Sequence, residues 1–159
     1  MNRLSHLQIR FSPDHKRYIY GVVTLLWVSG ALWLLFHYFL RTPGEFGTQA
    51  HPLESWWLRL HGLAAFASLV VIGSVLPVHA RRAWQLKKNR GSGVSMKVIT
   101  FWLSITGYAL YYFASDTNAG WLPLLHWIVG LALPLMLVVH IRRGRARAKI
   151  AHKPASAHA

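Results

Sequence analysis

The sequence predicts an all-α fold: an integral membrane four-helix bundle with its N and C termini in the cytoplasm. Three observations lead to this prediction. Hydrophobic residues make up 53% of the chain and charged residues only 14%, a balance that a small soluble domain could not bury. Four apolar runs each approach the length that crosses a bilayer. The basic residues flank the apolar runs mainly on one side of the predicted membrane, the side of the two termini.

The first two predicted spans are Tyr18–Leu40 and Ser55–Ala80. Trp56 and Trp57, at the start of the second span, are typical of a membrane–water boundary. The loop between the two spans contains residues that favour turns, so we expect irregular backbone there. These residues are Pro43, Gly44, Gly47 and Pro52.

The other two predicted spans are Val98–Ala114 and Trp121–Ile141. The third span is the shortest, and a start near Val94 would lengthen it. We expect Gly91–Ser92–Gly93 to break the loop before it, because glycine weakens helices. The chain after Lys149 is expected to be disordered.

The distribution of Lys and Arg predicts the orientation. All but two of the eighteen basic side chains fall on the side of the two termini, and the exceptions are Arg41 and Arg59. Lys and Arg concentrate on the cytoplasmic side of membranes. We therefore expect residues 1–17 to be a cytoplasmic segment, residues 18–143 to be the transmembrane domain, and residues 144–159 to be a basic, disordered cytoplasmic tail.

Charge and cysteine content exclude several classes of protein. The net charge is +14, but the basic clusters flank apolar runs, so we expect no nucleic-acid binding. The chain has no cysteine and ten histidines. Disulfides, cysteine-bound iron–sulfur clusters and covalently attached c-type haem are therefore excluded, and histidine becomes the candidate metal ligand.

Four histidines lie inside the predicted spans, where polar side chains are costly and usually functional. His61 and His79 are eighteen residues apart, and His126 and His140 are fourteen apart. At 100° per residue each pair falls on one helix face, with rises of roughly 27 Å and 21 Å. Because both spans run from outside to inside, His61 matches His126 in depth and His79 matches His140. Two imidazoles can hold a b-type haem between facing helices, so we predict two haems with these four iron ligands.

Other arrangements remain open. His37 could replace His61 at the outer side, and His15 could replace His79. The two spacings differ by about 6 Å of rise, which kinks at Pro77 and Pro134 could absorb. Proton relays and metal transport also use buried histidines. However, the four acidic residues all lie near span ends, and zinc would need three or four ligands close together.

Two further residues are candidates for cofactor binding. Gly130 follows His126 by one helical turn and would leave room for a porphyrin, although close helix packing explains it as well. Arg59, two residues before His61, could neutralise a haem propionate or serve as an ordinary interfacial arginine.

At these residues the chain resembles the four-helix, di-haem cytochrome b membrane proteins, which include cytochrome b561-like bacterial proteins and the membrane subunits of formate dehydrogenases and hydrogenases. The match consists of His126 and His140 with thirteen residues between them, and Gly130 after the first. It covers the membrane core, about Tyr18–Arg143. The resemblance implies bis-histidine haems near each surface and electron exchange with quinone. In several such families the first helix donates one haem ligand. This chain departs from that pattern, because it offers two histidines on the second span.

We therefore expect a membrane di-haem b-type cytochrome that transfers electrons between the quinone pool and a redox partner in a respiratory chain. It is expected to act as a subunit of a larger complex rather than as an independent enzyme. The expected partners are membrane lipid, quinone and a periplasmic or membrane redox protein, and the expected location is the bacterial inner membrane. The alternatives are a free-standing small quinone-linked oxidoreductase and a haem-free membrane anchor or assembly subunit.

Overall fold

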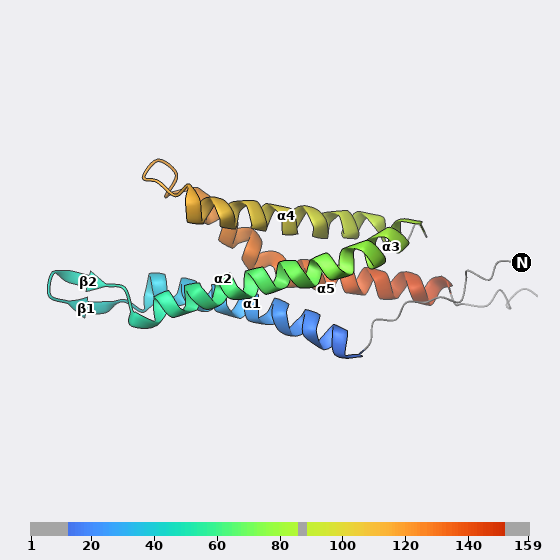
Figure 1. Cartoon of the computed structure of the whole chain (residues 1–159), viewed down its shortest axis with the longest axis horizontal. Helices are drawn as coiled ribbons and strands as arrows, with labels where there is room; N and C mark the ends of the chain where they lie inside the picture. Colours follow the sequence, from blue (N-terminus) through green and yellow to red (C-terminus); the bar gives the residue numbers. More distant parts are fainter. Residues whose placement is uncertain (1–12, 86–88, 152–159) are drawn as a thin grey trace, which may run out of the picture. The chain divides into compact units, whose positions relative to one another are not determined.

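The computed structural model describes residues 13–85 and 89–151, which are mostly helical (Figure 1). Four of the described helices are long and apolar enough to cross a membrane, so the prediction of four apolar helices of membrane-spanning length is confirmed and a multi-pass membrane protein is indicated. These helices are Pro13–Phe39, Pro52–Val75, Arg90–Tyr112 and Leu122–Ala146. The chain divides into two compact units, Met1–Gly73 and Ser74–Ala159, and each is described by itself.

The first unit is a helical hairpin. Helix α1 (Pro13–Phe39) and helix α2 (Pro52–Val75) run side by side, connected by the antiparallel strands β1 (Thr42–Gly44) and β2 (Gly47–Gln49) (Figure 1). The connection predicted to be irregular is thus a β-hairpin. Gly47 has a φ of 114°, a conformation that glycine adopts without a steric penalty. This residue lets the chain reverse direction after Glu45 and Phe46.

The second span does not continue as an α-helix to Ala80, its predicted end. A π-helical turn, η2 (Leu76–Ala80), and a short helix, α3 (Arg81–Gln85), follow α2 and belong to the second unit. Pro77 lies in this turn and has no backbone N–H, so it cannot donate the regular helical hydrogen bond. Single π-helical turns of this kind are frequent at functional sites. Here the turn carries His79.

The second unit also contains helix α4 (Arg90–Tyr112) and helix α5 (Leu122–Ala151), which lie side by side (Figure 1). The indole Nε1 of Trp102 on α4 donates a hydrogen bond of 3.2 Å to the carbonyl oxygen of Leu125 on α5. Helix α5 has 30 residues. At 1.5 Å per residue it is about 45 Å long, more than the ~30 Å hydrocarbon layer. Residues 144–151, the first half of the tail predicted to be disordered, are helical and end α5. Residues 152–159 lie outside the described residues.

Helix α4 begins well before the predicted start at Val98. Asn89 precedes it in the left-handed conformation (φ 50°, ψ 32°), and its carbonyl oxygen accepts a 3.1 Å hydrogen bond from the Gly93 N–H. Gly91–Ser92–Gly93 therefore forms the first turn of α4, and the prediction that it breaks a loop was wrong. The first N–H groups of a helix have no earlier carbonyl to bond within it, so weak helix formers are tolerated at this position.

Apolar side chains lie mainly on the outside of these helices. Among the described residues, the buried apolar side chains are Ala64 and Leu122, whereas Leu63 and Phe101 are 65% and 69% exposed. Water would be a poor solvent for such a surface, and lipid is a good one. The polar side chains inside the spans are consequently the candidate functional residues.

Candidate functional site

The four predicted ligands lie on three elements. His61 is on α2 in the first unit, whereas His79 on η2 and both His126 and His140 on α5 belong to the second unit. The predicted pairing of His61 with His126 joins the two units, each of which is described by itself. It therefore stays a prediction.

His79 and His140 are neighbours within the second unit. Their ring centres are 6.4 Å apart, and their planes are inclined by 69°. His79 is exposed and His140 is half-buried. The two histidines predicted to share the inner haem thus approach each other directly, one from the π-helical turn and one from α5.

The His140 ring is held by the first turn of α4. Its Nδ1 lies 3.0 Å from the hydroxyl oxygen of Ser92. The side-chain amide of Asn89 donates a 3.2 Å hydrogen bond to the backbone carbonyl of His140. Helix α4 therefore orients both the ring and the backbone of this residue, which explains why the helix has to begin as early as Arg90.

The His126 ring is held by the middle of α4. Its Nδ1 lies 2.9 Å from the hydroxyl oxygen of Thr106. The same hydroxyl oxygen lies 2.8 Å from the Trp102 carbonyl oxygen, and a Thr106 hydroxyl that donates to that carbonyl can accept a hydrogen bond from Nδ1. The ring also lies against Gly107, where an added Cβ would be 3.3 Å from the His126 Cε1.

The His61 ring is held by α1. Its Nδ1 lies 2.9 Å from the carbonyl oxygen of Leu26 and 3.3 Å from the hydroxyl oxygen of Ser29. The ring fits against Gly30, where an added Cβ would lie only 2.8 Å from the His61 Cε1. A glycine is therefore required at position 30 if the ring is to keep this place.

These three histidines share one hydrogen-bond pattern: Nδ1 faces an oxygen on the neighbouring helix. A carbonyl oxygen can only accept, so Nδ1 of His61 carries the hydrogen. The Thr106 hydroxyl can accept the same kind of bond from Nδ1 of His126. A neutral imidazole with its hydrogen on Nδ1 has its lone pair on Nε2, the nitrogen through which it would bind a metal. Histidine ligands of metals usually make such a bond with the other ring nitrogen.

The described residues contain no group of three or more His, Cys, Asp or Glu side chains placed to hold a metal ion. A zinc site needs three or four protein ligands and is not what this arrangement resembles. A haem brings four nitrogens of its own and takes only axial ligands from the protein. Two histidines per site are therefore enough for a haem.

The other predicted cofactor-binding residues have ordinary surroundings. A Cβ added at Gly130 would meet Leu103 of α4 at 3.8 Å, which is a normal packing distance between these helices. The Arg59 guanidinium lies over the Trp56 ring, 5.2 Å from its centre, and its side chain is exposed. Of the alternative ligands, His15 and His37 are both on α1 in the first unit.

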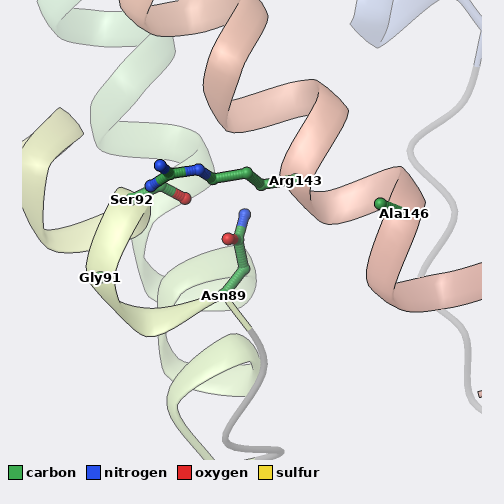
Figure 2. A pocket seen from close by; sticks show the side chains of 5 residues that line it. All are labelled: Asn89, Gly91, Ser92, Arg143 and Ala146. Carbon is green, nitrogen blue, oxygen red and sulfur yellow. The ribbon is translucent and has the colours of Figure 1, made fainter. Parts of the chain in front are cut away.

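A cavity of about 250 Å³ lies beside the residues that hold His140. It is lined by the start of α4 and the end of α5, through Asn89, Gly91, Ser92, Arg143 and Ala146 (Figure 2). Figure 2 shows the Arg143 side chain extending from α5 toward Ser92. A guanidinium in such a cavity suits a carboxylate or another anionic group.

Sequence reasoning missed the residues that orient the histidines. Each is a hydroxyl residue that precedes a glycine, in the pairs Ser29–Gly30, Ser92–Gly93 and Thr106–Gly107. Gly30 and Gly107 lie against a histidine ring, whereas nothing lies within 4 Å of a Cβ added at Gly93. In each pair the hydroxyl lies within 3.3 Å of a histidine Nδ1. The signal was present, because each pair interrupts or borders an apolar run, but small residues in membrane helices have a general packing explanation.

Comparison of the chain with models of protein families, with characterised proteins and with solved structures gives no match. The function has to be argued from the geometry of the histidines.

Proposed function

We propose that the chain is a membrane di-haem b-type cytochrome that carries electrons between the quinone pool and a redox partner in the bacterial inner membrane. The approach of His79 to His140 is the observation that carries this proposal. The four iron ligands are His61 and His126 for the outer haem, and His79 and His140 for the inner haem. When bound, each haem supplies a reversible one-electron centre.

The separation of His79 and His140 fits two axial ligands of one iron. If each imidazole nitrogen is about 2 Å from a shared metal ion, the two ring centres are roughly 6 Å apart. The ring centres of His79 and His140 are 6.4 Å apart.

The surroundings of the ligands also fit a haem. The Ser92 hydroxyl orients the His140 ring at 3.0 Å, and the exposed side of the pair leaves the rings accessible from outside the unit. Arg143, which lines the cavity beside Ser92, is placed to neutralise a propionate. Its charge would offset the cost of a carboxylate near the membrane surface.

For the outer haem the support is the matched environment of His61 and His126. Each ring has its Nδ1 2.9 Å from an oxygen of a neighbouring helix, and each lies against a glycine, Gly30 or Gly107. The same arrangement on two different helices favours a shared role. Pairing of these two histidines across the two units is part of the proposal.

The short connections between the four long helices, within the described residues, favour a role as a subunit. The described connections are a short β-hairpin, the helix α3 and the turns before α5. None of these has the size of a domain that could bind and transform a second substrate. The partner is therefore proposed to be a separate redox protein at the membrane or in the periplasm.

The test is the haem content of histidine variants. His126→Ala and His140→Ala should each lower the haem-to-protein ratio of the purified protein by about one, and each should remove part of the b-type α-band. His51→Asn is the control, because it removes a histidine that is not a proposed ligand. If both ligand variants kept the full haem content, or the unaltered protein had no haem spectrum, the proposal would be wrong and a membrane anchor would remain.

A further inference from the structure

We propose that His37 and Glu54 form a quinol site, in which His37 accepts a proton from the quinol headgroup. This inference rests on the proposed function, which supplies the electron acceptor. The pair lies in the first unit, at the end predicted to face outward, where α1 ends and α2 begins. It involves none of the four proposed iron ligands.

The pair is short and the carboxylate is buried. Nδ1 of His37 lies 2.6 Å from Oε1 of Glu54, and the Glu54 side chain is only 13% exposed. Oε2 of Glu54 is buried and has no hydrogen-bond partner among the residues that the structure describes. A buried carboxylate with one oxygen unsatisfied is costly. Such a cost in a membrane protein points to function more than to stability.

The imidazole is accessible on its other side. The His37 side chain is 35% exposed, and because Nδ1 faces Glu54, a ligand would meet it through Nε2. The ring stacks on Trp33, with centres 4.7 Å apart and an interplanar angle of 18°. Tyr38 meets it edge-on at 4.8 Å. Aromatic side chains can stack with a planar quinone ring, and the oxygen atoms of a quinone need a polar partner such as an imidazole.

Few other charged groups face the pair. The Arg41 guanidinium donates a 3.4 Å hydrogen bond to the His37 backbone carbonyl. His51 accepts a hydrogen bond from the Leu53 N–H and packs against Phe36 instead of His37. Glu54 is therefore the group that stabilises a positive charge on the His37 ring.

The pair also lies at a useful distance from His61. Gly30 on α1 contacts His61 on α2. His37 follows Gly30 by seven residues along α1, and Glu54 precedes His61 by seven residues along α2. Seven residues make nearly two helical turns, so both contacts fall on the same faces of the two helices, about 10 Å apart along the axis. A quinol at His37 would thus be near the proposed outer haem without touching its ligand.

The chemistry balances as follows. Oxidation of a quinol to a quinone releases two protons and two electrons. One proton moves from a quinol hydroxyl to Nε2 of His37, and Glu54 offsets the charge of the imidazolium that forms. The second proton goes to water at the outer surface. The two electrons go singly to ferric haem, the acceptor class in the proposed function.

The experiment compares His37→Gln and Glu54→Gln with His51→Asn in the purified, haem-loaded protein. His51→Asn removes a nearby imidazole but keeps an acceptor for the Leu53 N–H. The measurements are haem content, thermal unfolding, calorimetric binding of the oxidised form of a short-chain ubiquinone, and the rate of haem reduction by the corresponding quinol across a pH series. His37→Ala is also tested with added imidazole.

We expect both pair variants to keep two haems and their unfolding temperature. Their reduction rate should fall by about a hundredfold or more, the usual contribution of a positioned proton acceptor. Quinone binding should weaken for His37→Gln, the rate of both variants should rise with pH as water takes over the proton, and imidazole should restore part of the rate of His37→Ala. His51→Asn should behave like the unaltered protein.

Three outcomes would overturn the inference. Loss of a haem in His37→Gln would make His37 an iron ligand. Unchanged quinol kinetics and quinone binding in both variants would make the pair a structural contact, and the proposed function would stand. If His37→Gln and Glu54→Gln both unfolded, the milder variants His37→Asn and Glu54→Asp would replace them. Normal quinol kinetics in these two variants would also make the pair a structural contact. By contrast, an unaltered protein without haem would refute the proposed function, while calorimetry would still report on the quinone site.

Discussion

At the residue scale, the orientation of three histidines depends on hydroxyl residues of a neighbouring helix, and two of the rings also lie against a glycine of that helix. Ser29, Ser92 and Thr106 each lie within 3.3 Å of a histidine Nδ1. An imidazole on a helix in lipid has several rotamers of similar energy, and one fixed oxygen selects among them. These contacts therefore fix the direction in which each histidine ring points.

The hydroxyl of Thr106 can be removed without changing the size of the side chain. In Thr106→Val the His126 Nδ1 loses its acceptor, so the affinity of the site for haem should fall by about 10- to 100-fold. Haem titration of the apoprotein measures this change. Ser104→Ala is the matched control, because the Ser104 hydroxyl donates to Thr100 of its own helix. Equal haem affinity in both variants would show that Thr106 has no orienting role.

The space at Gly30 gives a second prediction at this scale. A methyl group in Gly30→Ala would lie 2.8 Å from the His61 ring and should displace it. Overpacking of this kind costs about 1–3 kcal/mol, so the unfolding temperature and the outer-haem absorption should both decrease. Gly21→Ala is the control, since nothing lies within 4 Å of a Cβ at that position. A variant with unchanged absorption and stability would contradict the close packing of Gly30 with His61.

At the element scale, the π-helical turn η2 interrupts the second predicted span, and each of the two parts carries one candidate iron ligand. The α-helical part carries His61, and the turn carries His79. Because Pro77 cannot donate a backbone hydrogen bond, the turn can hold one more residue than an α-helical turn. One residue corresponds to a rotation of about 100°, which is enough to decide whether His79 faces His140.

Replacing Pro77 tests that role. Pro77→Ala restores the missing N–H and should favour a continuous α-helix, which turns His79 away from His140. The inner haem should then be lost while the outer haem is kept, as measured by haem content and by redox titration of the remaining α-band. Pro123→Ala is the control, because Pro123 lies in the first turn of α5, where a missing N–H costs little. If Pro77→Ala kept both haems, the turn would not be what positions His79.

At the scale of the whole molecule, the distribution of basic residues predicts the orientation in the membrane. Positive charge is retained on the cytoplasmic side during insertion, so the β-hairpin and the turn before α5 should face outward. The chain has no cysteine, so single introduced cysteines report on one position each. Thr48→Cys and Thr117→Cys should react with a membrane-impermeant maleimide added to intact cells.

Gln85→Cys on α3 is the matched position for the opposite side. It should react only after the cells are opened. Labelling of Gln85→Cys in intact cells, together with protection of Thr48→Cys, would invert the orientation and place the His37–Glu54 pair on the inner side.

The number and approximate positions of the spans could be predicted from the sequence, because apolar length is a local property that lipid enforces. The start of α4 could not. Gly91 and Gly93 read locally as helix breakers, whereas the contacts of Ser92 and Asn89 with His140 give the helix a reason to begin there. The β-hairpin between α1 and α2 was likewise read as irregular, since its strands have only three residues each.

The candidate ligands were found from the sequence by depth alone, through the spacing of histidines along two helices. Depth follows from residue number at a fixed rise. The partners of the ring nitrogens do not, because Leu26, Ser29 and Thr106 belong to other helices. The His37–Glu54 contact was missed for the same reason: its members are seventeen residues apart and meet only when the hairpin folds back.

The sequence by itself determined that four helices are long and apolar enough to cross a membrane, and it predicted that the candidate histidines lie at two depths, since both depend on hydrophobicity and helical rise counted along one chain. Only the tertiary structure decided which nitrogen of a histidine faces an oxygen, that His79 comes within 6.4 Å of His140, and that Glu54 is buried against His37. Those features depend on distances between helices, and such distances are set by side-chain packing and by the π-helical turn instead of by any local pattern.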